Sequence, residues 1–366
     1  MATTVWLVTP DGLSTSRIPL GTHRDYPSAP DSPARSILNT VTHVGIIGAG
    51  SIGGHLAAML AAHGHTVSVT ARGANLAAIR ADGLRVSGAF GDLHERVRSQ
   101  ETLPDVDAVV LTTKTLDTET ALAANPIAAE RPVLVIQNGL NGHGRAATIL
   151  GHERVAAGIS TTAANLVEPG RISVTAAGKL FIGGQEGPLF AELLQSSVPG
   201  VSLVDGIEGA QWTKLVINMV NAVPALVDKS VQDTIATPSL LRIITASMRE
   251  TIRIGRASGS TLRPLQGLSP FLLRLIEHGP LSFAAMVPRR MAAVMGDVPN
   301  LGSTQQSIVR GKPTEIDYLN GAVVDAARKL GREAPVNAAI TALVHEREER
   351  DQPFTAEDVA QRVPLR

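Results

Sequence analysis

The feature that most constrains the fold is a glycine-rich turn, Gly48 to Gly53, which separates an apolar segment from a helix-like one. Residues 43–47 have the pattern of a buried strand, and residues 52–63 have the pattern of a helix. Further apolar runs bounded by turn residues or prolines predict strands at 66–70, 108–112 and 132–137. Because strands that alternate with helices form parallel sheets, we expect an α/β domain with a doubly wound sheet.

The turn itself, which reads GAGSIG, fits the pyrophosphate of a dinucleotide. Gly48 permits a tight turn, Gly50 lets the backbone approach the pyrophosphate, and Gly53 lets the helix pack closely on the strand. The first N–H groups of the helix, around Ser51 and Ile52, have no partner within the helix and attract anions. A merely structural glycine turn is the alternative, but the strand-turn-helix context favours a Rossmann-type dinucleotide-binding domain.

Three polar residues at the ends of predicted strands are candidates to bind the cofactor. Arg72 follows the strand at 66–70, where a carboxylate would bind the ribose of NAD; its guanidinium fits the 2′-phosphate of NADP instead. Lys114, in Thr-Lys-Thr, can hold phosphate or ribose oxygens, and Asn138, in Gln-Asn-Gly, can hydrogen-bond near the nicotinamide ribose. A surface lysine and a turn asparagine are the alternatives for the last two.

The second half of the chain has a different pattern. Strand candidates at 155–158, 171–175 and 180–183 are expected to complete the other side of the sheet, whereas from about residue 207 the pattern is helical. We therefore expect an irregular N-terminal arm at 1–41, an NADP-binding Rossmann domain at 42–206, and an all-helical substrate and catalytic domain at 207–366.

One predicted helix, Trp212 to Asn221, is apolar except for a polar stripe. Lys214, Asn218 and Asn221 stand at i, i+4 and i+7 and hence on one face. Buried polar groups need partners, which a polar cleft would supply. A partly desolvated lysine, its pKa drawn toward neutrality, can donate a proton to the alkoxide that forms when a keto group is reduced. An exposed lysine with amides in helix contacts is the alternative.

A second polar constellation spans Ser303 to Gly321. Within it, Glu315 is expected to pair with Lys214 or to accept a hydrogen bond from a substrate hydroxyl, and Ser303 can donate to a substrate carboxylate. The spacing of Thr314 to Asp317 fits a helix start with acidic residues in its first turn equally well. The residues alone leave these two interpretations open.

Composition and charge exclude several functional classes. The formal net charge is zero, which gives no electrostatic attraction to nucleic acid or to an anionic membrane. Without cysteine there are no disulfides, thiolate zinc sites or cysteine nucleophiles. Residues 1–41 lack a signal-peptide pattern and no apolar run reaches the ~20 residues of a membrane span, so a cytoplasmic protein is expected. His63 and His65 have no nearby acidic ligand, and no Gly-x-Ser-x-Gly elbow occurs, so neither a metal site nor hydrolysis is expected.

Taken together, these residues make the chain similar to the ketopantoate reductase (2-dehydropantoate 2-reductase) family over about residues 43–345. The family's order is followed by the glycine turn, Arg72, Lys114, Asn138, Lys214 with Asn218, and the run from Ser303 to Gly321. The resemblance implies an active site in a cleft between the two domains. It also implies that Lys214 is the general acid, that Glu315 pairs with it and binds the hydroxyl end of the substrate, and that Asn218 and Ser303 hold substrate.

The activity that the resemblance implies is the NADPH-dependent reduction of 2-dehydropantoate to pantoate, a step of pantothenate biosynthesis, by a monomer or homodimer. One departure bears on the substrate: a second family asparagine lies eight positions beyond the lysine, where this chain has Ala222, with Asn221 one step of about 100° earlier. The alternatives are the same chemistry on a different bulky 2-keto acid, or an NADP-binding sensor that does not turn over substrate.

Overall fold

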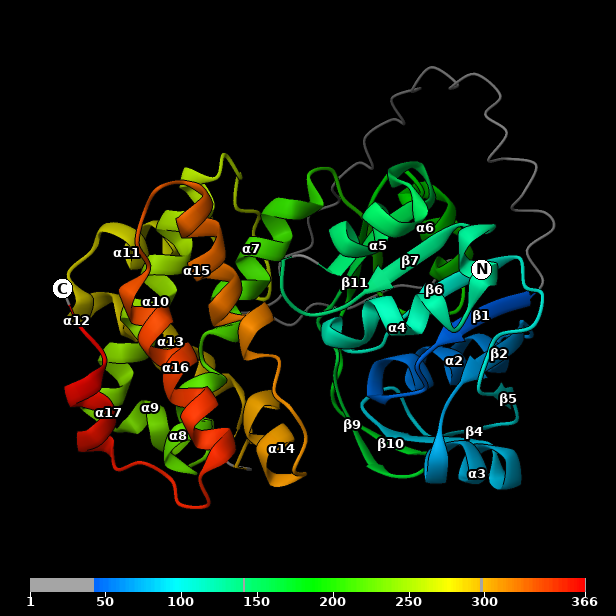
Figure 1. Cartoon of the computed structure of the whole chain (residues 1–366), viewed down its shortest axis with the longest axis horizontal. Helices are drawn as coiled ribbons and strands as arrows, with labels where there is room; N and C mark the ends of the chain where they lie inside the picture. Colours follow the sequence, from blue (N-terminus) through cyan, green and yellow to red (C-terminus); the bar gives the residue numbers. More distant parts are fainter. Residues whose placement is uncertain (1–42, 141, 297–298, 366) are drawn as a thin grey trace, which may run out of the picture.

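The computed structural model describes residues 43–140, 142–296 and 299–365, so the arm expected at 1–41 lies outside the described residues. The chain forms an α/β half and a helical half that lie side by side (Figure 1). The last strand of the α/β half, β12, spans Val201–Leu203, and the first helix of the helical half, α7, spans Ile207–Asn218. The expected fold class, a doubly wound sheet followed by helices, is confirmed.

The larger sheet has eight strands in the order β12-β11-β8-β7-β6-β1-β2-β5. With β12 it comprises β1 (His43–Ile47), β2 (Thr66–Thr70), β5 (Arg98–Gln100), β6 (Ala108–Leu111), β7 (Val133–Ile136), β8 (Val155–Ser160) and β11 (Leu180–Gly184). Neighbouring strands are parallel except β8 and β11. The strand order reverses between β1 and β6, and in open sheets of this kind ligands bind at such a switch point.

Helices cover both faces of this sheet. The helices of the α/β half are α2 (Ser51–Ala62), α3 (Gly73–Asp82), α4 (Thr118–Ala123), α5 (Gly142–Leu150) and α6 (Gly187–Gln195), with short 3-10 helices η1 (Thr115–Asp117), η2 (Pro126–Ala129) and η3 (His152–Arg154). In β6, Val110 joins the core under α2, α3 and α6, whereas Val109 and Leu111 join the core under α4 and α5. Burial on both faces explains why the central strands are continuously apolar.

A smaller sheet corrects one sequence-based expectation. Its four strands, in the order β4-β3-β10-β9, are β3 (Leu84–Gly88), β4 (Leu93–Glu95), β9 (Ala163–Glu168) and β10 (Arg171–Ala176). The segment at 171–175 was expected to complete the main sheet but lies here instead, as β10. Ile172 explains the placement, because it is buried in the core beside α2, and a side chain added at Gly54 of that helix would come within 2.4 Å of it.

The helical half is built around the long helix α10 (Pro238–Ala257). Beside α7 the other helices are α8 (Ala222–Val227), α9 (Val231–Ala236), α11 (Pro270–His278), α12 (Leu281–Ala284), α13 (Met286–Val294), α14 (Ser303–Val309), α15 (Asn320–Lys329), α16 (Pro335–Glu349) and α17 (Ala356–Arg362), with the 3-10 helix η4 (Ile316–Tyr318). One apolar face of α10 carries Leu240, Ile244, Met248 and Ile252, all fully buried in the common core. None of the described helices is both long and apolar enough to cross a membrane.

Candidate active site

The ends of the parallel strands bring the polar loops of the α/β half to one edge of the sheet. Gly48 follows β1, Thr112 follows β6, Asn138 is two residues beyond β7, and Thr161 follows β8. These four strands run parallel and are adjacent in the order β8-β7-β6-β1, so their carboxyl ends lie at the same edge. This edge faces the helical half, which contacts Lys114, Thr115 and Thr161.

The glycine turn at this edge has two glycines that the protein's own packing requires and one that it does not. Gly48 has φ of +102°, and a Cβ at Gly53 would lie 2.1 Å from the Gly48 carbonyl oxygen. The Thr112 hydroxyl donates to that same oxygen at 2.8 Å. A Cβ at Gly50 would meet nothing within 4 Å. The missing side chain at Gly50 therefore leaves open space directly before the start of α2 at Ser51, with half-buried Ile52 next to it.

Arg72 lies where the sequence places it, just beyond β2. It is the N-cap residue of α3, has an extended backbone, and its side chain is exposed. Three residues further on, Asn75 ties the glycine turn to the smaller sheet: its amide donates to the Ala49 carbonyl and accepts from the Gly170 N–H, both at 2.8 Å. The sequence reading missed Asn75, because an asparagine in a first helical turn carries no signal of a contact this distant.

Lys114 and Asn138 both reach the helical half. The Lys114 amine donates to the Pro313 carbonyl at 2.9 Å and to the Ser307 hydroxyl at 3.1 Å. The Asn138 side chain hydrogen-bonds to Glu315. These contacts place both residues at the junction of the two halves, so the cofactor contacts expected for them stay predictions.

Glu315 is held by the α/β half. Its carboxylate accepts from the Thr115 N–H at 3.3 Å, in addition to the bond with Asn138. Burial raises the pKa of Glu315, while the Thr115 N–H, the nearby Lys114 charge and the Asn138 side chain act to lower it. Burial dominates, so the carboxyl group takes up a proton more readily than an exposed glutamate does.

Lys214 lies on α7 and is partly buried. Burial lowers the pKa of its amine to about 8. The amine donates to the Gln266 side-chain oxygen at 3.3 Å, and the Gln266 amide donates to the Thr161 carbonyl at 3.3 Å. Within the described residues Lys214 and Glu315 form no ion pair, which departs from the pairing we expected, because the Glu315 carboxylate is directed toward Thr115 and Asn138 instead.

The polar stripe beyond Lys214 is shorter than expected. Asn218 is buried and is the last residue of α7, one turn after Lys214, whereas Asn221 lies beyond the helix, at the N-cap of α8. The expectation that Asn221 shares a helical face with Lys214 was wrong. The physical reason is Pro224, because a proline inside a helix has no N–H to donate and clashes with the carbonyl four residues earlier. The hydrogen bonds of α7 therefore cannot continue through Pro224, which lies instead in the first turn of α8, where a proline is tolerated.

Asn221 nevertheless lies against Gly302, the residue before Ser303. A Cβ at Gly302 would lie 3.1 Å from atoms of Asn221, so the chain entering α14 packs directly on this asparagine. Ser303 is the first residue of α14 and is exposed. The structure thus brings the start of the Ser303 segment to the turn that follows α7.

Comparison with known proteins matches both halves of the chain to one family. The model for "Ketopantoate reductase PanE/ApbA" matches residues 44–187, and the model for the C-terminal part of the same proteins matches residues 206–348. The chain belongs to the ketopantoate reductase family. This is a family of oxidoreductases, and the fold and the order of the motifs described above agree with it.

Individual relatives agree with this assignment. The 2-dehydropantoate 2-reductase of Pyrococcus horikoshii is 28% identical over 317 residues, which cover 83% of this chain and 96% of the relative. A ketopantoate reductase structure from Ralstonia eutropha JMP134 is 28% identical, covers 84% of this chain and 98% of its own, and superposes with a TM-score of 0.73. The fold is also similar to that of D-mandelate dehydrogenase in complex with NADH and anilino(oxo)acetate, at 19% identity, coverage of 84% and 98%, and a TM-score of 0.69.

Further contacts join the two halves of this ketopantoate reductase family member at residues that the sequence reading missed. The Gln211 amide on α7 lies 3.0 Å from a ring nitrogen of His143 on α5. Arg145 donates to the Tyr318 hydroxyl at 3.2 Å and lies over its ring. Tyr318 belongs to the run from Ser303 to Gly321 that resembles the family, which was a reason to place it at the site. No sequence pattern indicated the contact between Gln211 and His143.

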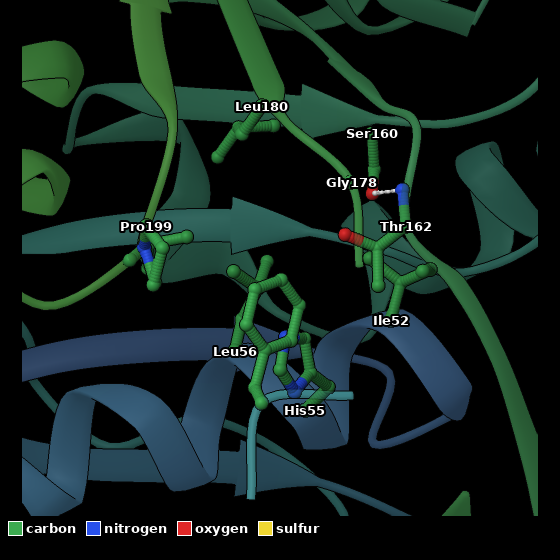
Figure 2. Close-up of a pocket in the computed structure, with 10 residues that line it drawn as sticks. Ile52, His55, Leu56, Ser160, Thr162, Gly178, Leu180 and Pro199 are labelled. Atoms are coloured by element: carbon green, nitrogen blue, oxygen red, sulfur yellow. Dashed lines mark hydrogen bonds between the residues drawn. The ribbon is translucent and has the colours of Figure 1, made fainter. Parts of the chain in front are cut away.

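A small hollow lies beside the first two turns of α2 (Figure 2). Ile52, His55 and Leu56 of α2 face Thr162, Leu180 and Pro199 across it. His55 is buried, stacks on Phe90 with ring centroids 5.2 Å apart, and has its pKa lowered by burial to about 4. His55 is therefore neutral at physiological pH and takes no part in proton exchange there.

Proposed function

We propose that this protein reduces a 2-keto acid to a 2-hydroxy acid with NADPH, and that the substrate is 2-dehydropantoate, which becomes pantoate. The observation that carries the proposal is the partly buried Lys214 amine, whose pKa of about 8 lies within reach of neutral pH. Through Gln266 this amine is linked to Thr161, which lies at the sheet edge that also carries the glycine turn. A proton donor is thereby tied to the edge at which a dinucleotide would bind.

The residues of the glycine turn fit a dinucleotide. The space at Gly50, which no atom of residues 43–140, 142–296 or 299–365 fills, allows the backbone to approach a pyrophosphate. The N–H groups at Ser51 and Ile52 open a helix of twelve residues toward it. The exposed guanidinium of Arg72 is available for the 2′-phosphate of NADP. When bound, the reduced nicotinamide supplies the hydride for the keto carbon.

Lys214 has the role of general acid in this proposal. An ammonium group beside the keto oxygen stabilises the negative charge that develops as hydride arrives, and it then gives up its proton to complete the hydroxyl group. Burial favours this role because an amine with a pKa near the working pH is protonated in a large fraction of molecules and still donates readily. Asn218, one helical turn along α7, would hold the substrate beside it.

Glu315, Asn221 and Ser303 complete the proposed substrate site. The raised pKa of Glu315 suits a group that exchanges hydrogen bonds with a substrate hydroxyl. Ser303, at the first turn of α14, would donate to the substrate carboxylate, and Asn221 packs against the segment that carries it. Lys114 and Asn138 would contact the cofactor at the same edge where they now meet the helical half.

A bulkier 2-keto acid is a second candidate substrate. A hollow of about 720 Å³ opens beside Gln266 and Thr161, between the turn at 264–269 and the segment around Gly178 and Pro199. The fold neighbour D-mandelate dehydrogenase, whose structure contains NADH and anilino(oxo)acetate, has the same architecture. Such a volume would accommodate a larger substituent than that of 2-dehydropantoate.

The test is a panel of 2-keto acids assayed with NADPH and with NADH by following oxidation of the nicotinamide. We expect turnover with NADPH, highest with 2-dehydropantoate, and a reversed cofactor preference in Arg72→Asp, because the carboxylate repels the 2′-phosphate. Absence of turnover with every keto acid would favour a sensor that binds NADP without reducing a substrate. Equal NADPH affinity in Arg72→Asp and the parent protein would refute the role of Arg72.

A further inference from the structure

Gln266 occupies an unusual backbone position next to Lys214. The segment Leu265 to Leu268 is a tight two-residue turn, in which Leu265 and Leu268 form an antiparallel bridge. The two central residues both have positive φ, +45° at Gln266 and +81° at Gly267. This geometry is typical of a type I′ turn, whose first central position favours asparagine, aspartate or glycine.

A glutamine is a costly choice at that position. Its Cβ crowds the backbone in the left-handed region, which glycine adopts without strain. The turn does not need the glutamine for packing either, because the buried side chains of Leu265 and Leu268 fix it on both sides while Gln266 is exposed. Leu265 packs on Ile159 and Ile207 at the junction of the two halves, and Leu268 packs in the core of the helical half. Strain of this kind, held by rigid surroundings, points to a role for the side chain.

The Gln266 side chain uses both ends of its amide. The oxygen accepts a hydrogen bond from the Lys214 amine at 3.3 Å, and the nitrogen donates to the Thr161 carbonyl at 3.3 Å. Thr161 is itself fixed, because its N–H and hydroxyl bond to the Lys179 backbone at 2.9 and 3.1 Å. One side chain thus links the amine of α7 to a rigid strand end of the α/β half.

No charged group competes with Gln266 as the partner of Lys214 in the described residues. The elements around Lys214 carry Glu208 on the same helix, Arg263 on the loop that precedes the turn, and Lys179 beyond Thr161. None of these charges contributes to the lowered pKa of Lys214, which results from burial. Among the residues that the structure describes, the amine donates to the Gln266 oxygen and to no other acceptor.

We propose that Gln266 is a positioning residue, which holds the Lys214 amine in register with the sheet edge by bridging it to Thr161. The proposal rests on the proposed function, in that positioning matters to the reaction only if Lys214 donates the proton. The alternative is that the turn merely connects two segments and that the glutamine contacts are incidental.

Two substitutions and one control separate these possibilities. Gln266→Gly removes the bridge and relieves the backbone strain, so the protein should fold with an unchanged or higher Tm while kcat for the keto acid falls roughly 10-fold to 100-fold and KM changes little. Gln266→Glu keeps the side-chain length and puts a carboxylate beside the amine, which favours the charged ammonium. The control Thr261→Glu adds the same charge to the same exposed loop, five residues earlier.

The Lys214 amine can be titrated without any substrate, by competitive labelling with an amine reagent across pH and mass spectrometry of the labelled peptide. We expect Gln266→Glu to raise the pKa of Lys214 above that of the parent protein, and Thr261→Glu to leave it unchanged. An unchanged pKa in Gln266→Glu, or an unchanged kcat in a folded Gln266→Gly, would overturn the proposal. If the parent protein reduces no 2-keto acid, the proposed function fails by itself, and the labelling result still decides whether Gln266 contacts Lys214.

Discussion

The two titratable groups of the candidate site differ in how they are held. Lys214 has one neutral partner, Gln266, at 3.3 Å, whereas Glu315 is bonded to the Thr115 N–H and the Asn138 side chain and lies near the charge of Lys114. Burial moves both groups toward neutrality, because it lowers the pKa of the lysine and raises that of the glutamate. The two groups therefore share burial as the largest influence on their pKa and differ in the number and charge of the groups around them.

This difference indicates that Lys214 and Glu315 have separate roles. An ammonium group positioned by a single hydrogen bond to neutral Gln266 still has N–H groups to donate to a reacting oxygen, which is what a proton donor requires. A carboxyl group fixed by backbone and side-chain donors is suited to orient a bound molecule, and its contacts with Thr115 and Asn138 also hold the helical half against the sheet edge. We therefore expect Lys214 to act in the chemical step and Glu315 to act in orienting the substrate and the two halves.

The largest effect is expected at Lys214. Lys214→Met should lower kcat by roughly 10²-fold to 10⁴-fold, the usual contribution of a general acid. Its Tm at neutral pH should not fall, because the substitution removes a charge that burial disfavours. The assay is NADPH oxidation at saturating keto acid, and Lys229→Met, at an exposed lysine, is the control. A kcat within threefold of the parent protein would mean that the amine has no chemical role.

An intermediate effect, on stability as well as on rate, is expected at Glu315. The folded-state pKa of Glu315 is raised, so ionisation opposes folding, and the fold loses stability as pH rises above the pKa of an unfolded glutamate near 4.5. Glu315→Gln removes that loss, so its Tm should exceed that of the parent protein at pH 7 and approach it near pH 4. Its kcat/KM should fall about 10-fold, less than for Lys214→Met.

A Tm difference between Glu315→Gln and the parent protein that is independent of pH would contradict the raised pKa of Glu315. In that case the carboxyl group would be ionised at no cost in the folded protein, and the contrast in surroundings described above would not hold. Glu333→Gln, at an exposed glutamate in the same half, is the matched control and should show no pH-dependent difference.

The smallest effect is expected at the contacts that hold the helical half. Lys114→Met removes the bonds to Pro313 and Ser307, together worth about 1 kcal/mol, so kcat/KM should fall several-fold while the pKa of Lys214 stays unchanged. Labelling of the Lys214 amine across pH measures the second quantity. A change in that pKa would show that the two groups are coupled, and would remove the distinction between them.

The α/β half was largely predictable from the sequence, and the reason is local. Residues 43–47 and 66–70 are strands as expected, because buried parallel strands read as short apolar runs between turns. The smaller sheet was not foreseen, since Leu93–Glu95 and Ala163–Glu168 are short and partly exposed and have no such signature. Whether a strand such as Arg171–Ala176 joins one sheet or the other depends on distant packing against α2, which no local pattern encodes.

In the candidate site, too, local features were predictable from the sequence and contacts between distant segments were not. The positions of Gly48, Arg72 and Lys214 relative to their own strands and helices followed from the sequence. Contacts between the halves did not, and the partner of Lys214 turned out to be Gln266, fifty-two residues away in an exposed turn. The end of α7 before Asn221 could have been foreseen from Pro224, because a proline at that position prevents one continuous helix from Trp212 onward.

If the Lys214 ammonium donates the proton, its ionisation must appear in the pH dependence of kcat/KM for the keto acid. This dependence should be recorded for the parent protein and for Lys214→Met. We predict that kcat/KM of the parent protein falls about tenfold per pH unit above a pKa of about 8, and that this basic limb is absent from the residual activity of Lys214→Met. A basic limb with the same pKa in both proteins would show that a group other than Lys214 donates the proton.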